Sequence, residues 1–210
     1  MNINTNLLNK FIKSKSSLLA VSKYLDKENT QKLIQNLEKD YPNIIVWFWE
    51  NRVASLKIKK IDKNLVHFIW NIQSKEIKEI LKYCWVIHSV CNIKHLKKIN
   101  DICFKQDSFV KIFLQINVDS SKSLWINISE VPEYLKLIQN LENISLIWFS
   151  SIWKREFTRE EKIKEFDTLI NLKNKYIPNW LISAWTSKDY EIALEKKIDI
   201  IRIGTLLYNN

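Results

Sequence analysis

The chain has 210 residues, a length that suits one sizeable domain and is short for two, so we expect a single domain over residues 1–210. It carries 33 Lys and Arg against 23 Asp and Glu, a formal net charge of +10, but the lysines are scattered along expected helices and form no nucleic-acid-binding motif. No apolar run approaches the roughly 18 residues of a membrane span, and the Asn- and Lys-rich start is unlike a signal peptide, which predicts a cytoplasmic protein.

Apolar strands and helices alternate along the chain, after a short amphipathic helix over 2–13. The expected strands cover 18–22, 44–48, 66–69, 85–88, 109–116, 144–149, 181–184 and 198–203. The expected helices cover 26–40, a Lys-rich stretch ending near 60, 74–83, 92–103, 129–140, 158–176 and 187–196. Continuous apolar runs indicate parallel strands that are buried on both faces. Eight such units in succession predict an α/β fold, a (β/α)8 TIM barrel with an extra N-terminal helix, rather than an open doubly wound sheet.

Functional groups of such a barrel gather where its strands end. The first strand ends at Lys23, and a partly buried lysine amine can form a Schiff base with a carbonyl compound, although a solvated lysine at a strand end is also common. The last two strands lead to Ser187 and to Gly204-Thr205 ahead of a final helix, hydroxyls and a turn that suit a phosphate group. Paired acids for glycoside hydrolysis are absent from the strand ends. Together these residues predict a site for a phosphorylated aldehyde across the barrel mouth.

His67 and His88 also lie near strand ends and could be metal ligands. No clustered acids or further histidines accompany them, so we expect structural hydrogen bonds and no metal site. His95 lies in a Lys-rich helix and is expected to face solvent. The three cysteines are an odd number without paired spacing, which indicates neither a disulfide framework nor a zinc motif and favours packing roles.

Several motifs resemble, in order and spacing, those of the pyridoxal-phosphate homeostasis protein family. They are LLAVSK at 18–23, FWEN at 48–51, HFIWxxQS at 67–74, IHSV at 87–90, QIN at 115–117, SxWxSxD at 183–189 and RIGT at 202–205. The resemblance spans about residues 16–208. It implies a single-domain barrel that is similar to the N-terminal domain of alanine racemase and binds pyridoxal 5′-phosphate (PLP).

The resemblance also implies roles for individual residues. It identifies Lys23 as the Schiff-base lysine and Arg202 as the arginine near the pyridine nitrogen, where a cation weakens the ring as an electron sink. The other cofactor-binding positions that it implies are Asn51, Ser187, Gly204 and Thr205.

The function implied by the resemblance is intracellular PLP homeostasis, that is, buffering or delivery of the cofactor, together with amino-acid homeostasis. Apo forms of PLP-dependent enzymes are the implied recipients, and we expect a monomer. We expect no robust catalysis, because racemisation needs an acid/base on each face of the substrate and alanine racemase takes its second base from a further domain. A small PLP-dependent racemase or decarboxylase is the alternative, and a basic nucleic-acid-binding protein is a remote one.

Glycine is nearly absent from the chain. There is one glycine, where average usage of about 7% would give roughly 15, whereas tryptophan occurs nine times. Trp49, Trp70, Trp125, Trp148 and Trp185 stand where the family carries glycine. An indole cannot replace a hydrogen atom at a tight turn beside a ligand. We therefore hypothesise that UGA codons of this gene are read as glycine; nine true tryptophans filling a core are the alternative.

Overall fold

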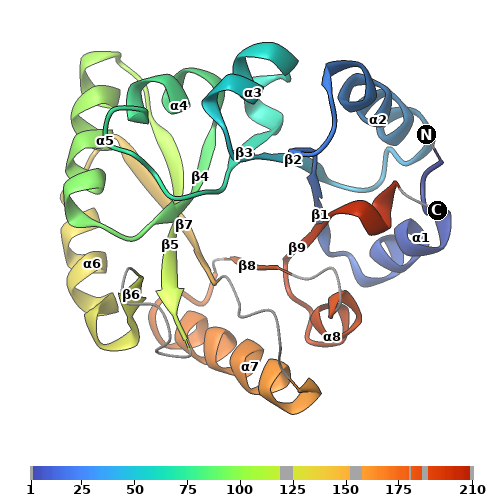
Figure 1. Ribbon diagram of the computed structural model, residues 1–210. Helices are drawn as coiled ribbons and strands as arrows, with labels where there is room; N and C mark the ends of the chain where they lie inside the picture. Colours follow the sequence, from blue (N-terminus) through green and yellow to red (C-terminus); the bar gives the residue numbers. More distant parts are fainter. Residues whose placement is uncertain (1, 119–124, 152–157, 180, 186–188, 209–210) are drawn as a thin grey trace.

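A computed structural model describes residues 2–118, 125–151, 158–179, 181–185 and 189–208 (Figure 1). In this part of the chain, eight parallel strands pair in the order β1-β2-β3-β4-β5-β7-β8-β9, and β9 pairs back to β1. The pairing closes a barrel, so the predicted (β/α)8 fold is confirmed. A short strand, β6, pairs with β5 outside the closed ring.

The strands are β1 (Ser17–Val21), β2 (Val46–Glu50), β3 (Val66–Phe68), β4 (Val86–Val90), β5 (Val110–Asn117), β6 (Ile126–Asn127), β7 (Ile144–Ser150), β8 (Leu181–Trp185) and β9 (Ile200–Ile203). The helices are α1 (Thr5–Ser14), α2 (Lys27–Asp40), α3 (Val53–Lys59), α4 (Ile77–Tyr83), α5 (Ile93–Lys105), α6 (Val131–Ile138), α7 (Arg159–Tyr176) and α8 (Tyr190–Glu195). Single 3-10 turns cover η1 (Lys63–Leu65), η2 (Ile128–Glu130) and η3 (Thr205–Leu207).

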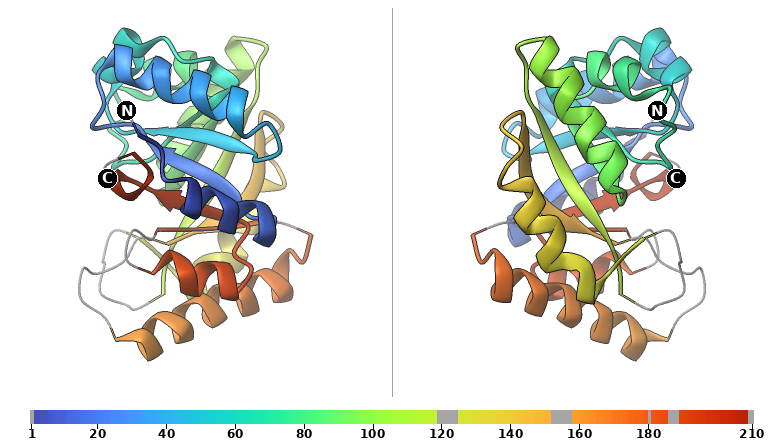
Figure 2. Two further views of the ribbon diagram at one scale, coloured as in Figure 1. Left: turned by 90° about the vertical axis from the view of Figure 1, so that its right-hand side faces the viewer. Right: turned by 90° about the vertical axis from the view of Figure 1, so that its left-hand side faces the viewer.

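Several helices begin at residues whose side chains accept hydrogen bonds from the first free backbone amides. The Asp26 carboxylate accepts from the amide of Asn29 at 2.7 Å and starts α2. Thr158 and Glu161 form a capping box that starts α7. The helices surround the strands, with α1 and α2 on one side of the barrel and α5 and α6 on another (Figure 2). None of the helices in the described residues is long and apolar enough to cross a membrane.

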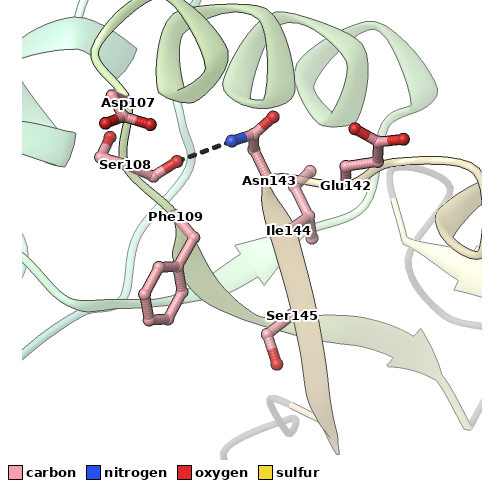
Figure 3. A pocket seen from close by; sticks show the side chains of 7 residues that line it. All are labelled: Asp107, Ser108, Phe109, Glu142, Asn143, Ile144 and Ser145. Carbon is pink, nitrogen blue, oxygen red and sulfur yellow. Dashed lines mark hydrogen bonds between the residues drawn. The ribbon is translucent and has the colours of Figure 1, made fainter.

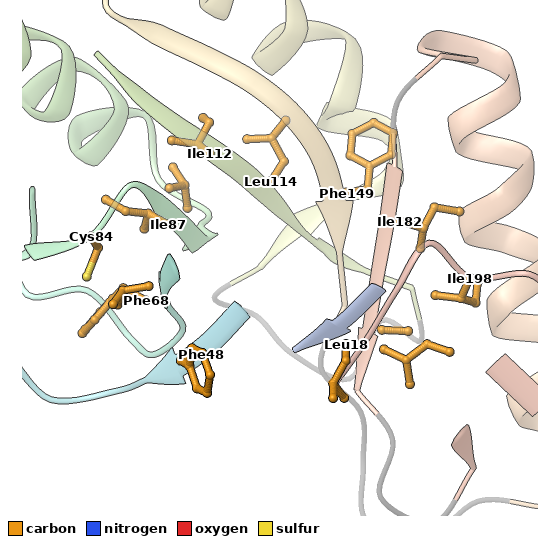
Figure 4. Close-up of a cluster of buried hydrophobic side chains, with 14 of the residues drawn as sticks. Leu18, Phe48, Phe68, Cys84, Ile87, Ile112, Leu114, Phe149, Ile182 and Ile198 are labelled. Atoms are coloured by element: carbon orange, nitrogen blue, oxygen red, sulfur yellow. The ribbon is translucent and has the colours of Figure 1, made fainter. Parts of the chain in front are cut away.

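Two buried clusters fill the molecule on either side of the strands. Leu18 and Phe48 belong to the larger cluster, between the strands and the helices (Figure 4), whereas Leu19 and Trp49 belong to a smaller one. Because side chains alternate along a strand, this smaller cluster lies inside the barrel. Burial on both faces explains why each strand reads as a continuous apolar run.

The two ends of the described chain meet beside α1. The amide of Asn4 donates to the carbonyl of Leu207 at 2.9 Å, and the Leu207 amide donates to the carbonyl of Gly204 at 2.9 Å. In the described residues, the final helix expected after Thr205 is one 3-10 turn, η3. The expected N-terminal helix is confirmed as α1.

Candidate functional site

Lys23 lies two residues beyond β1, at the carboxyl end of the barrel strands, and is half-buried. Its Nζ lies 4.3 Å from the ring centroid of Trp49, 5.0 Å from that of Tyr24 and 5.7 Å from that of Trp70. These are cation–π distances. The Lys23 amine is thus held against an aromatic wall at the barrel mouth and is not a fully solvated lysine.

Arg202 lies on β9 and is fully buried. Its Nε donates to the Ser183 hydroxyl at 3.1 Å, and Nη2 donates to the Ser183 carbonyl at 3.4 Å. Burial lowers the pKa of Arg202 from 12.5 to about 9, so the guanidinium remains charged at neutral pH. Its Nη1 has no hydrogen-bond partner within the described residues. A buried donor without a partner is rare in a folded protein, and it suits an acceptor on a bound ligand.

The indole of Trp49 neighbours both cations. Its ring centroid lies 5.9 Å from Cζ of Arg202 in addition to 4.3 Å from Nζ of Lys23. Its Nε1 donates to the carbonyl of Ile69 at 2.9 Å, and the side chain is 0% exposed. The indole is therefore a fixed part of the barrel interior.

A buried ion pair supports the backbone in front of Lys23. Nζ of Lys59 lies 2.7 Å from Oε1 of Glu50, and the same nitrogen donates to the Ser22 carbonyl at 2.7 Å. The Ser22 hydroxyl donates to Oε1 of Glu50 at 2.6 Å. This cluster was not predicted from the sequence, because Lys59 looks like the solvated lysines around it. The signal in the sequence was Glu50, a carboxylate at the end of the apolar strand VWFWE, which needs a buried partner.

The two histidines predicted to be structural contact each other. Nε2 of His88 lies 2.8 Å from Nδ1 of His67, and burial lowers the pKa of both rings well below 6.5. The His88 ring stacks on Phe113, with centroids 3.5 Å apart. The predicted structural hydrogen bonding is therefore confirmed. No group of three or more His, Cys, Asp or Glu residues suited to a metal ion occurs in the described part of the chain.

The remaining histidine and Cys103 lie in α5, whereas Cys84 and Cys91 stand on either side of β4. His95, expected to face solvent, is half-buried and lies 3.0 Å from the Ser74 hydroxyl. Cys84 and Cys103 are buried and Cys91 is half-buried, and all three are free thiols.

Strand register places the other predicted cofactor residues at the same end of the barrel. Val21 pairs with Trp49, so Lys23 and Asn51 follow at equal distances along β1 and β2. Ala20 pairs with Ile203, which puts Gly204 next to the end of β1. Asn51 is half-buried, Gly204 is buried and Thr205 is exposed. The predicted phosphate ligand Ser187 lies outside the described residues.

A surface pocket lies at the opposite end of the barrel, where β5 and β7 begin (Figure 3). Asn143 lines it and donates through Nδ2 to the carbonyl of Ser108 at 2.9 Å. The backbone N–H of Asn143 donates to Oδ1 of Asn100 at 3.1 Å. These bonds tie the turn before β7 to the turn before β5 and to α5, a structural task that needs no ligand.

The closed parallel barrel, with an amine and a buried guanidinium at its carboxyl end, defines an α/β protein with a cationic site at the barrel mouth. The chain belongs to the family described as alanine racemase, N-terminal domain, whose model matches residues 1–210. It is 26% identical over 204 residues to the pyridoxal phosphate homeostasis protein of Aquifex aeolicus, covering 86% of this chain and 87% of the relative. It is 29% identical over 194 residues to the protein of the same name from Synechocystis, covering 85% and 87%. The predicted resemblance to the pyridoxal-phosphate homeostasis protein family is confirmed.

Solved structures share the fold. PipY of Synechococcus elongatus with PLP bound has a TM-score of 0.78 and 19% identity, covering 97% of this chain and all of PipY. An alanine racemase of Clostridium difficile has a TM-score of 0.76 and 15% identity, covering 99% of this chain and 57% of the racemase.

The polar residues at the mouth fit PLP in their chemistry. Lys23 offers an amine to an aldehyde, and Arg202 offers a buried cation with an unpartnered nitrogen among the described residues. The side chain of Trp49 does not fit. A cofactor ring that touches both cations needs the space that this indole fills.

Proposed function

We propose that this chain binds pyridoxal 5′-phosphate through a Schiff base between the Lys23 amine and the cofactor's aldehyde, and that it acts in intracellular PLP homeostasis. The observation that carries the proposal is the half-buried Lys23 amine at the end of β1, beside the strand that holds the buried Arg202. The relatives named pyridoxal phosphate homeostasis protein, and the PLP-bound structure of PipY, support it.

The backbone before Lys23 is held from two sides. Lys59 donates to the Ser22 carbonyl, and the Ser22 hydroxyl donates to Glu50. Both bonds are buried, so the position from which the Lys23 side chain departs is fixed before any ligand arrives. Such preorganisation lowers the entropy cost of forming one defined adduct.

Arg202 gives the site its electronic character. When bound, PLP supplies an aldehyde for a lysine and a pyridine ring that withdraws electrons. A guanidinium directed to the pyridine nitrogen leaves that nitrogen unprotonated and weakens electron withdrawal. Arg202 thus favours holding the cofactor over using it.

The end of β9, next to the end of β1, is the proposed place of the phosphate. Gly204 and Thr205 at the end of β9 are the proposed phosphate-binding residues with Ser187, and Asn51 is a proposed contact of the ring. Backbone amides and hydroxyls of this kind make charge-assisted hydrogen bonds to a phosphate dianion.

In the cell, we propose that the chain buffers PLP or delivers it to apo forms of PLP-dependent enzymes, and thereby influences amino-acid homeostasis. Reversible imine formation suits this task, because the cofactor leaves by hydrolysis without a change in oxidation state.

Reductive trapping tests the proposal. The protein is incubated with PLP and reduced with borohydride, and peptide mass spectrometry locates the cofactor. We expect the label on Lys23 and its loss in Lys23→Ala, whereas Lys27→Ala, which removes an exposed lysine four residues away, retains it. Equal visible absorbance from PLP bound to the parent chain and to Lys23→Ala would reject Lys23 as the binding residue.

A further inference from the structure

Trp49 stands where the ring of the proposed cofactor must lie, so an inference about its role rests on the proposed function. The indole lies next to both Lys23 and Arg202, and its Nε1 is bonded to the Ile69 carbonyl at 2.9 Å. It is fully buried, so it is no surface lid that swings aside without cost. Access of a ring to both cations requires this side chain to leave its hydrogen bond and its packing.

Two further tryptophans lie at the carboxyl ends of strands. Trp70 follows β3, is 50% exposed and has its ring centroid 5.7 Å from Nζ of Lys23. Trp185 is the last residue of β8. An indole that is half exposed contributes little to a core. The carboxyl ends are instead the places where a barrel brings its backbone close to a ligand, and close approach is a task for glycine.

The requirement at position 49 is the absence of a side chain. Trp49 is not among the described residues with a positive φ, which are Lys15, Lys60, Asp107 and Lys197. The backbone conformation at position 49 therefore does not require glycine. The space beside the two cations, however, is available to a ligand ring only if residue 49 carries no indole.

The composition of the whole chain also suggests that tryptophan stands in place of glycine. Nine tryptophans accompany one glycine, where average usage of about 7% would give roughly 15 glycines. The codon UGA differs by one base from the tryptophan codon UGG and by one base from the glycine codon GGA. Reading it as glycine at all nine positions gives ten glycines and removes both anomalies at once.

We propose that residue 49 controls access to the Lys23 site and that it is glycine in the cell, because its UGA codon is read as glycine. The same reading applies to the other eight tryptophan positions. With glycine at 49, the space between the barrel interior and the Lys23 amine is open to the cofactor ring.

The mass of the protein from its source cells tests the identity of the residue. Tandem mass spectrometry of the peptide that spans residues 46–52 is expected to give glycine at 47 and 49, and the intact mass is expected to be lower by nine tryptophan-to-glycine exchanges. Tryptophan at position 49 of the native protein overturns the recoding.

Recombinant variants test access separately. Borohydride trapping at limiting PLP is compared for the tryptophan form, Trp49→Gly and Trp49→Ala, with circular dichroism as the check on folding. We expect roughly tenfold more Lys23 adduct in the two opened variants, because overpacking of a filled site is removed. Trp49→Phe keeps a ring at this position and should remain low. Trp85→Gly, at the amino end of β4, is the matched control and should also remain low.

The outcomes separate this inference from the proposed function. Equal adduct in the tryptophan form and in both opened variants overturns control by residue 49 and leaves PLP binding intact. Folded opened variants that form no Lys23 adduct overturn the proposed function, while the native mass still decides the identity of residue 49.

Discussion

Nζ of Lys59 lies 2.7 Å from Oε1 of Glu50, and both side chains are buried directly beneath the turn that carries Lys23. An ion pair removed from water stabilises a fold only when its geometry and its further hydrogen bonds are good. Here Ser22 supplies two of those bonds, one through its hydroxyl and one through its carbonyl. The second oxygen of Glu50 has no hydrogen-bond partner within the described residues. The cluster is therefore sensitive to the loss of either partner.

Lys59→Met should lower the free energy of unfolding by about 3–5 kcal/mol, because it leaves the Glu50 carboxylate buried without its counter-ion. Urea unfolding followed by circular dichroism measures the change. Lys57→Ala is the matched control, since Lys57 pairs with Glu79 on the surface, where water screens the pair, and its loss should change the free energy of unfolding little. Similar losses from the two substitutions would show that the buried pair has no special role.

The buried pair His67 and His88 should make the fold sensitive to mild acid. Burial lowers the pKa of both rings below the 6.5 of the unfolded chain, so below that pH the unfolded chain binds more protons than the fold does. The stability that they contribute is complete above about pH 6.5 and is lost as the pH falls through their lowered pKa. The double variant His67→Phe, His88→Leu should show a flatter dependence of the urea midpoint between pH 7.5 and 5 than the parent. Parallel curves would contradict this account.

Ser183→Ala should lower the free energy of unfolding by about 1–3 kcal/mol, because it removes the acceptor of the buried Nε of Arg202. Ser89→Ala is a suitable comparison. The Ser89 hydroxyl is buried and has no hydrogen-bond partner within the described part of the chain, so its removal should be nearly neutral or stabilising. The prediction fails if thermal or urea unfolding gives the same shift for both serines.

The PLP-loaded protein should exchange the α-proton of amino acids with deuterated solvent no faster than free PLP does. In the proposed site Arg202 disfavours electron withdrawal by the ring, and Tyr208, whose hydroxyl is bonded to the end of β1, is not available as a base. The Tyr208 hydroxyl donates to the Val21 carbonyl at 2.8 Å, and burial raises its pKa to about 12. Proton NMR of alanine and lysine over hours measures the exchange. Rapid exchange that disappears in Lys23→Ala would identify a PLP-dependent enzyme instead.

The barrel and the place of Lys23 could be predicted because their signals are local. A run such as LLAVS must be buried on both faces, and a residue just beyond it must lie at the rim. The Glu50–Lys59 pair could not be predicted in the same way, because Lys59 and its neighbour Lys60 are identical in sequence terms. Only the packing of α3 over the end of β2 buries the one and exposes the other.

Other features lay between these cases. The inward direction of Trp49 follows from alternation along β2, since Phe48 faces the helices, but its contact with Arg202 depends on how far the barrel interior extends. The two-residue strand β6 has no pattern of its own and exists through its pairing with Ile116 and Asn117.

The pairing of β1 with β9 joins segments from opposite ends of the chain, with Leu19 beside Arg202. Every other pair in the closed ring joins segments that are nearer in sequence, so this seam carries the largest loop-closure cost. Lys23 and Arg202 stand on its two sides. A ligand that needs both therefore recognises only the sealed barrel, and it stabilises that state in proportion to the logarithm of its concentration over its Kd. Ligand occupancy of this site would accordingly report that β1 and β9 have paired.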